Sequence, residues 1–136
     1  PEAISTLRNM GVASFLIASA LTAVVGQRLV RTICTECKTS YAAPKAMVKS
    51  VGLPDSTKRL YKGKGCPDCY HTGGKGRSGV FEVLEITPAV RKMIAAEEPV
   101  EKITKAAKLK SMAERCRAKV KKGLVTPEEY LRTIRA

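Results

Sequence analysis

Four of the five cysteines occur as two C-x-x-C pairs, Cys34 with Cys37 and Cys66 with Cys69. The backbone inside such a pair turns back on itself, so that both thiolates can reach one ion. Two pairs supply the tetrahedral four-sulfur shell of a closed structural zinc site, which leaves no open position for water. The spacing therefore predicts a structural Zn²⁺ bound by these four cysteines.

Two other chemistries remain open for the same cysteines, an iron–sulfur cluster and a pair of redox-active disulfides. Neither pair lies at the start of a thioredoxin-like βαβ pattern, so zinc is the preferred interpretation. His71 follows Cys69 by two residues, and we expect it near the site or on the surface rather than as a ligand. Cys116 lies on an apolar helical stripe and is expected to be a small core residue.

The sequence contains no pattern that indicates a catalytic site. A phosphate-binding loop needs Gly-Lys followed by Ser or Thr, but both Gly63–Lys64 and Gly74–Lys75 are followed by glycine. The single histidine, His71, has no Ser/His/Asp constellation around it in the pattern. We therefore expect no catalytic residues here and no catalysis by this chain alone.

The composition fits a basic, mainly helical domain. The 136 residues have a net charge of +13, and only 4% are aromatic, which favours an aliphatic helical core. The basic residues are spread along the sequence without the aromatic pattern of RNA-binding domains, so we expect a solvated lysine-rich surface and no nucleic-acid partner. Because Pro1 is not a methionine and helical sequence follows at once, we expect a piece of a longer protein.

The predicted elements give an α+β fold, mainly α, with helices around a small four-cysteine zinc subdomain that has short strands. Gly11 separates a first helix from an apolar one over residues 14–25, which is too short to span a bilayer and is expected to be buried. The remaining predicted elements are a strand over 27–33, a helix over 44–51 that stops at Gly52, and a strand over 80–86. Further helices are predicted after Thr87, from Pro99, and around the apolar stripe that begins at Leu109, which Gly123 ends as a left-handed cap. A last helix is predicted at a capping box formed by Thr126 and Glu129.

Three stretches together resemble one family. Residues 7–11, 15–16 and 27–31 are similar to the end of the ATPase domain of type II secretion and type IV pilus assembly ATPases. The run from Gly65 to Glu82 follows the metal-knuckle signature of that family, G-C-x-x-C-x-x-T-G-x-x-G-R-x-G-x-x-E. The terminal Glu-Glu-x-Leu-Arg of residues 128–132 also fits. The resemblance covers nearly the whole chain.

The resemblance implies three segments: 1–33 as the remnant of a RecA-like ATPase domain, 34–86 as the zinc-binding subdomain, and 87–136 as a C-terminal helical subdomain. It implies a hexameric motor ATPase for secretion or pilus assembly, whose ATP and Mg²⁺ bind upstream. The expected partners are neighbouring subunits of the homo-hexamer and inner-membrane platform proteins, with a cytoplasmic location peripheral to the membrane. A free-standing zinc ribbon that binds nucleic acid through its lysines is the alternative, and a redox protein is a third possibility.

The same resemblance suggests roles for two further sets of residues. Arg28 and Arg31 would lie next to the nucleotide domain, where a guanidinium can pair with ATP phosphate, unless both are ordinary surface arginines at a strand end. The turn after the second cysteine pair is expected to be structural, with Arg77 bonding backbone carbonyls or Glu82. The residues assigned to this turn are Gly76, Arg77, Gly79 and Glu82.

Overall fold

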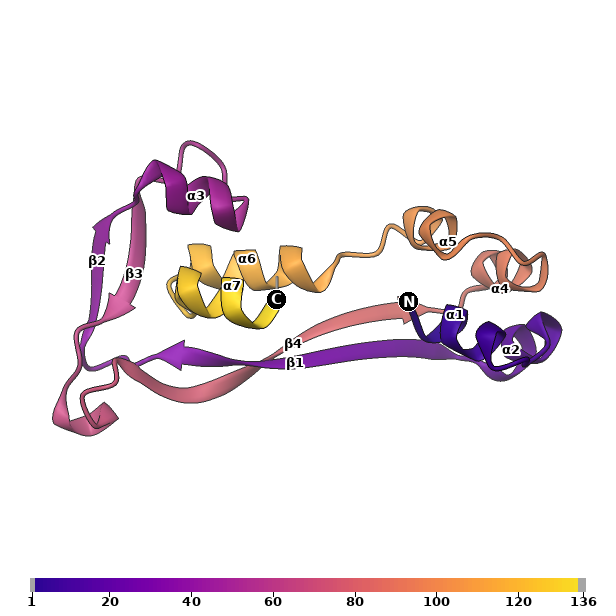
Figure 1. The fold of residues 1–136 in the computed structure, drawn as a ribbon, viewed down its shortest axis with the longest axis horizontal. Helices are drawn as coiled ribbons and strands as arrows, with labels where there is room; N and C mark the ends of the chain where they lie inside the picture. The colour runs from indigo at the N-terminus through magenta and orange to yellow at the C-terminus, as the bar shows by residue number, and fades with distance from the viewer. Residues whose placement is uncertain (1, 135–136) are drawn as a thin grey trace. The chain divides into compact units, whose positions relative to one another are not determined.

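The computed structural model describes residues 2–134, which contain seven α-helices, one 3₁₀-helix and four strands. The helices are α1 (Glu2–Asn9), α2 (Ser14–Ala20), α3 (Lys45–Val51), α4 (Pro88–Ala95), α5 (Val100–Ala106), α6 (Met112–Lys121) and α7 (Pro127–Ile134). The strands are β1 (Ala23–Ile33), β2 (Lys38–Ala42), β3 (Arg59–Gly63) and β4 (Gly74–Glu85), and the 3₁₀-helix η1 is Pro67–Cys69. β1 pairs with β4 and β2 with β3, both antiparallel (Figure 1). The predicted α+β class is confirmed.

The described residues form two compact units, each assembled from two separate stretches of chain. We call residues 1–26 with 81–110 the helical unit, and residues 27–80 with 111–136 the cysteine unit. The division into the consecutive segments 1–33, 34–86 and 87–136 stays a prediction. Residue 1 and residues 135–136, at the ends of its outer segments, lie outside the described residues.

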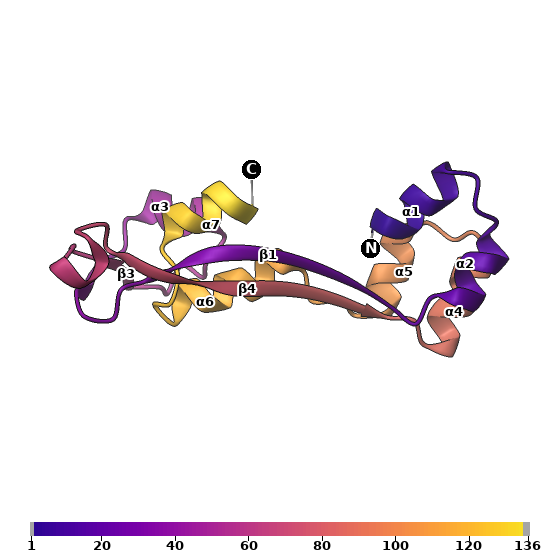
Figure 2. The same ribbon diagram turned by 90° about the horizontal axis from the view of Figure 1, so that it is seen from below.

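The helical unit has an aliphatic core. The helices α1, α2, α4 and α5 lie together in both views of the ribbon (Figure 1, Figure 2). Its buried side chains are Ile4, Ile17, Ala18, Leu84, Ile86, Val90, Ile94 and Ile103. Two arginines bind backbone carbonyls in and just after the last turns of α4 and α2. Arg8 donates to the Ile94 and Glu98 carbonyls (3.0 and 2.9 Å), and Arg91 donates to those of Ala18, Ser19 and Leu21.

The predicted helix over residues 14–25 is wrong in its second half. α2 ends at Ala20, and Leu21 already has extended backbone angles (φ −74°, ψ 135°). Val24 and Val25 are β-branched and fit a pleated strand better than a helix. Pairing with β4 therefore extends the predicted strand 27–33 back to residue 23. Within residues 2–134, no helix has both the length and the apolar character needed to cross a bilayer.

The cysteine unit has a second core, between β1, α3, β3, β4, α6 and α7. Its buried side chains are Val30, Val48, Val51, Leu53, Leu60, Val80, Cys116, Val120, Val125 and Tyr130. The core position predicted for Cys116 is thus confirmed. The β2–β3 pair, with Lys38 opposite Gly63 and Ala42 opposite Arg59, is absent from the predicted elements. The predicted strand 80–86 belongs to the longer β4, because the glycine-rich run before it also pairs with β1.

Several predicted helix ends are confirmed by their cap geometry. The Thr87 hydroxyl accepts a hydrogen bond from the Val90 N–H (3.3 Å) at the start of α4. Gly52 and Gly123 have the left-handed φ angles, +73° and +67°, that glycine adopts without a Cβ penalty after α3 and α6. At the start of α7, the Thr126 hydroxyl accepts from the Glu129 N–H (3.1 Å).

Only this half of the predicted capping box forms, because the Glu129 carboxylate turns to β1 instead. It accepts hydrogen bonds from the Arg31 backbone N–H (2.8 Å), from Arg132 (2.7 Å) and from the Thr133 hydroxyl (3.2 Å). Burial raises the pKa of Glu129, but these donors outweigh burial and hold the pKa below its usual value of 4.5. The buried carboxylate is therefore ionised at neutral pH and binds α7 to β1.

We expect Glu129→Gln to destabilise the chain by about 2 kcal/mol at pH 7, because it replaces a buried charged acceptor with an amide. Since folding lowers the pKa of Glu129, its contribution is complete above the unfolded value of 4.5 and disappears as pH falls through the folded value. The difference in unfolding free energy between wild type and variant should therefore shrink below about pH 4.5, as urea titrations at several pH values would show. Glu128→Gln, on the exposed side of α7, is the control; a difference that stays constant with pH would contradict this role.

Candidate metal centre

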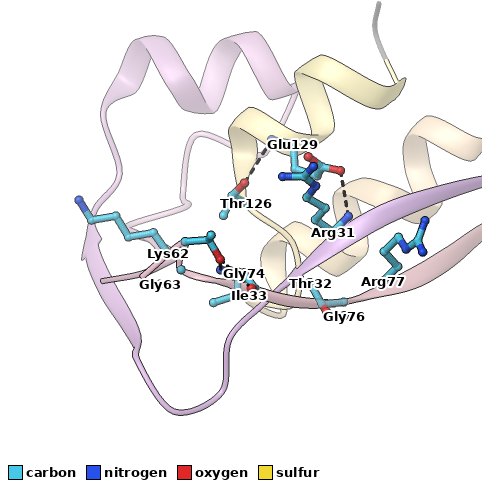
Figure 3. A pocket seen from close by; sticks show the side chains of 12 residues that line it. Arg31, Thr32, Ile33, Lys62, Gly63, Gly74, Gly76, Arg77, Thr126 and Glu129 are labelled. Atoms are coloured by element: carbon cyan, nitrogen blue, oxygen red, sulfur yellow. Dashed lines mark hydrogen bonds between the residues drawn. The ribbon is translucent and has the colours of Figure 1, made fainter. Parts of the chain in front are cut away.

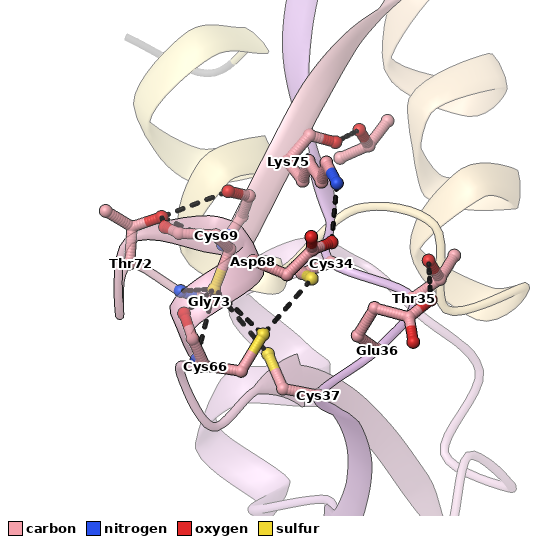
Figure 4. Close-up of polar contacts among 12 residues, drawn as sticks. Cys34, Thr35, Glu36, Cys37, Cys66, Asp68, Cys69, Thr72, Gly73 and Lys75 are labelled. Atoms are coloured by element: carbon pink, nitrogen blue, oxygen red, sulfur yellow. Dashed lines mark hydrogen bonds and ion pairs between the residues drawn. The ribbon is translucent and has the colours of Figure 1, made fainter.

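The four paired cysteines lie at the ends of strands. Cys34 directly follows β1 and Cys37 directly precedes β2, whereas Cys66 and Cys69 belong to the η1 turn between β3 and β4. Because β2 pairs with β3 in antiparallel fashion, the chain returns after the long segment between the two cysteine pairs, and the second pair comes close to the first. All four sulfur atoms lie within 4.8 Å of one another (Figure 4). The structure thus brings together the four cysteines that the sequence singled out.

The spacing of the sulfurs fits one tetrahedral ion. The Sγ–Sγ distances are 3.9 Å for Cys34–Cys66, 3.8 Å for Cys37–Cys69 and 3.7 Å for Cys66–Cys69. A tetrahedron with metal–sulfur bonds of about 2.3 Å has edges of about 3.8 Å, whereas a disulfide needs about 2.05 Å. All five cysteines are free. These thiols can therefore hold a metal ion, and their geometry is not that of disulfides.

Backbone N–H groups around the cluster favour thiolates. The Gly65 N–H donates to Cys37 Sγ (3.3 Å), and the N–H groups of Cys66 and Gly73 donate to Cys69 Sγ (3.3 and 3.2 Å). Burial raises the pKa of Cys69, but the two N–H donors and the hydrogen bonds with the Cys66 and Cys37 thiols outweigh burial and lower the pKa to about 6. Burial raises the pKa of Cys66 to about 11. Both the donor set and the hydrogen bonds therefore suit a cation that shares the charge of several thiolates.

Two glycines fix the positions of the loops that contain the two cysteine pairs. A Cβ on Gly63 would lie 2.0 Å from the Gly73 carbonyl oxygen, and a Cβ on Gly73 would lie 2.6 Å from the Gly63 carbonyl oxygen. Gly73 also has φ +74°, and its carbonyl accepts from the Cys34 N–H (3.0 Å). Only glycine permits this approach, which holds the end of β3, the start of β4 and the first cysteine pair together.

The loop after Cys69 contains an unusual backbone. Tyr70 and His71 both have left-handed angles (φ 51° and 60°), which non-glycine residues seldom adopt. The His71 N–H donates to the Cys66 carbonyl (2.8 Å), which stabilises this conformation. The His71 side chain is exposed and does not belong to the four-residue cluster, and Tyr70 is 89% exposed. The ligand set therefore contains sulfur only.

The predicted turn residues Gly76, Arg77, Gly79 and Glu82 all lie within β4. Among residues 2–134, the Arg77 side chain makes no hydrogen bond or ion pair, so the predicted bond to a carbonyl or to Glu82 is not found. Other residues fasten the turn. The Thr72 hydroxyl donates to the Cys69 carbonyl (2.6 Å), and Lys75 pairs with Asp68 (Figure 4).

The structure connects Arg28 and Arg31 to α7. The Arg28 guanidinium donates to the Thr133 carbonyl, and the Arg31 backbone N–H donates to Glu129. Their predicted proximity to nucleotide stays a prediction. Sequence reasoning missed Glu129 as the partner of Arg31, although its capping-box position had marked it as a residue that bonds backbone N–H groups.

The fold and the site define an α+β protein with a closed four-cysteine centre, and comparisons with known proteins give its family. A family model described as "Type II/IV secretion system protein" matches residues 1–132. The chain is 40% identical to the "Type II secretion system ATPase E" of Vibrio cholerae, an alignment that covers 96% of this chain and 26% of the relative. It is 37% identical to the "Type IV pilus assembly ATPase PilB" of Thermus thermophilus, covering 98% of this chain and 16% of the relative.

The chain therefore belongs to the type II/IV secretion system protein family. A third relative, the "Type II secretion system protein E" of Pseudomonas aeruginosa, is 35% identical over 98% of this chain and 27% of its own length. The chain thus spans about a quarter of the secretion relatives and about a sixth of the pilus relative. The predicted family resemblance is confirmed.

We expect the purified chain to contain one zinc ion and Cys66→Ser to lose it, because three thiolates cannot close the tetrahedral shell. Native mass spectrometry and a zinc-release assay would measure the stoichiometry. Cys116→Ala is the matched control: it removes a buried cysteine outside the cluster, should cost about 1 kcal/mol of stability and should keep the ion. Equal zinc content in wild type and Cys66→Ser would contradict the assignment.

We expect Gly63→Ala to destabilise the chain by about 3 kcal/mol, because the added Cβ would overlap the Gly73 backbone at 2.0 Å. Gly74→Ala is the matched control, since its Cβ would meet only the Thr32 carbonyl oxygen at an ordinary 3.4 Å. Urea unfolding of the metal-loaded variants would measure both. Similar midpoints for the two variants would show that the close approach is not a constraint.

Proposed function

We propose that this chain is the zinc-binding C-terminal structural and interaction module of a hexameric motor ATPase that powers protein secretion or pilus assembly. Family membership over residues 1–132, together with relatives described as a secretion ATPase and a pilus assembly ATPase, supports this proposal. The observation that carries the structural part is the set of four sulfurs within 4.8 Å of one another.

The proposed ion is Zn²⁺, bound by Cys34, Cys37, Cys66 and Cys69. When bound, it would cross-link loops at the ends of four strands without taking part in a reaction, because four sulfur ligands leave no position for substrate. Such loops bury little apolar surface, so metal binding contributes directly to their folding. The protein itself contributes the close contact of Gly63 with Gly73 and the N–H donors, which position the thiols and lower the pKa of Cys69.

ATP and Mg²⁺ would bind in the remainder of the proposed motor. Within the sequence, neither Gly63–Lys64 nor Gly74–Lys75 is followed by the Ser or Thr that a phosphate-binding loop needs. The zinc-binding module would then act as a rigid attachment, and its partners would be neighbouring subunits and the inner-membrane platform on the cytoplasmic side. A net charge of +13 supports a place near an acidic membrane surface.

In a longer protein that includes the phosphate-binding loop, we expect Cys66→Ser to lower ATP hydrolysis at least tenfold and to leave ATP affinity within about twofold. The reason is that the metal centre orders the module without contacting nucleotide. Steady-state hydrolysis and binding of a fluorescent ATP analogue would separate the two effects, with Cys116→Ala as the control.

Two outcomes would contradict the proposal. A longer protein without ATP hydrolysis would remove the motor function, whatever the metal does. Unchanged hydrolysis and unchanged oligomer size in the zinc-free Cys66→Ser protein would instead remove the structural role of the metal while leaving the motor intact.

A further inference from the structure

The net charge is divided very unevenly between the two units. The cysteine unit contains 18 Lys and Arg against six Asp and Glu, whereas the helical unit contains seven against six. Their net charges are therefore +12 and +1. The basic residues look evenly spread along the sequence because the cysteine unit is assembled from two separate stretches. Zinc with four thiolates would add −2 and leave the cysteine unit at about +10.

The cysteine unit contains a cavity of about 460 Å³ next to the metal centre (Figure 3). It lies between the end of β1, the end of β3, the start of β4 and the start of α7. Its basic lining residues are Arg31, Lys62 and Arg77, and Glu129 is the one acidic residue of the lining. This volume falls within the range of small-ligand sites. Gly74 and Gly76 form part of the wall, where the missing side chains leave room for a ligand.

The positive charge of this cavity is not neutralised by the protein. Glu129 is already paired with Arg132 (2.7 Å), and Lys62 lies over the Tyr41 ring (5.3 Å). Among residues 2–134, the guanidinium groups of Arg31 and Arg77 make no hydrogen bond or ion pair. Two unpaired guanidinium groups on one cavity match an anion with several oxygens, because each can donate two parallel hydrogen bonds.

We propose that this cavity binds a phosphate-type anion, either free phosphate or diphosphate or the phosphate group of a larger ligand. Arg31 and Arg77 rise from the paired strands β1 and β4 and would donate to its oxygens (Figure 3). The Lys62 side chain extends away from the two arginines and contributes to the positive electrostatic potential around the cavity. This proposal does not rest on the motor function, since it requires only the folded cysteine unit.

The test is a calorimetric titration of the full chain with sodium diphosphate at a constant ionic strength of about 0.15 M, which screens long-range attraction. We expect saturable binding of one diphosphate per chain. Arg31→Gln and Arg77→Gln should each weaken it about tenfold. Arg115→Gln, which removes the same charge from an exposed position of the cysteine unit outside the cavity, should change it less than twofold.

Two further measurements identify the source of the phosphate and keep the result independent of folding. Amide shifts at Gly74, Gly76 and Thr126 in a ¹⁵N spectrum should follow the diphosphate titration. ATP, and vesicles with or without phosphatidylglycerol, should compete only if they present their phosphate to the same cavity. Absence of saturable binding, or equal weakening in Arg115→Gln, would overturn the proposal. So would vesicle or DNA binding that diphosphate does not displace, because the ligand would then respond to the overall charge.

Discussion

Where β3 ends and β4 begins, the backbones of Gly63 and Gly73 approach so closely that a Cβ on Gly63 would lie 2.0 Å from the Gly73 carbonyl oxygen. The Gly73 carbonyl also accepts a hydrogen bond from the Cys34 N–H, so the end of β1 is held next to this contact. The sulfur spacing of 3.7–3.9 Å follows, because each cysteine pair is attached to one of these strand ends. The metal centre thus depends on a contact between backbones, which side-chain packing alone could not supply.

The loops that contain the cysteines bury little apolar surface, and a metal ion bound by the four sulfurs would cross-link them. The N–H groups of Gly65, Cys66 and Gly73 already point at sulfur, so part of the thiolate charge is stabilised before any ion binds. In the proposed motor, a module held together in this way could hold a neighbouring subunit without changing shape. The four cysteines would then have a structural role, as proposed above.

The cysteine unit combines this rigidity with a large positive charge. A net charge far from zero destabilises a compact body through self-repulsion. The thiolates of the metal centre, the buried Glu129 carboxylate and the proposed anion each reduce that repulsion at a defined place. Glu129 does so while it fixes α7 to β1, which explains why a carboxylate is tolerated at 8% exposure.

The sequence by itself determined the features that depend on neighbouring residues. The C-x-x-C pairs, the Thr87 cap and the left-handed Gly52 and Gly123 follow from residue types at short spacings. The family resemblance follows from several such stretches along the chain. The end of α2 at Ala20, the β2–β3 pairing and the role of Glu129 were decided only by the tertiary structure. Each depends on a partner distant in sequence, such as β4 for β1 or Arg31 for Glu129. The concentration of positive charge in the cysteine unit has the same cause, because this unit is assembled from two separate stretches of the chain.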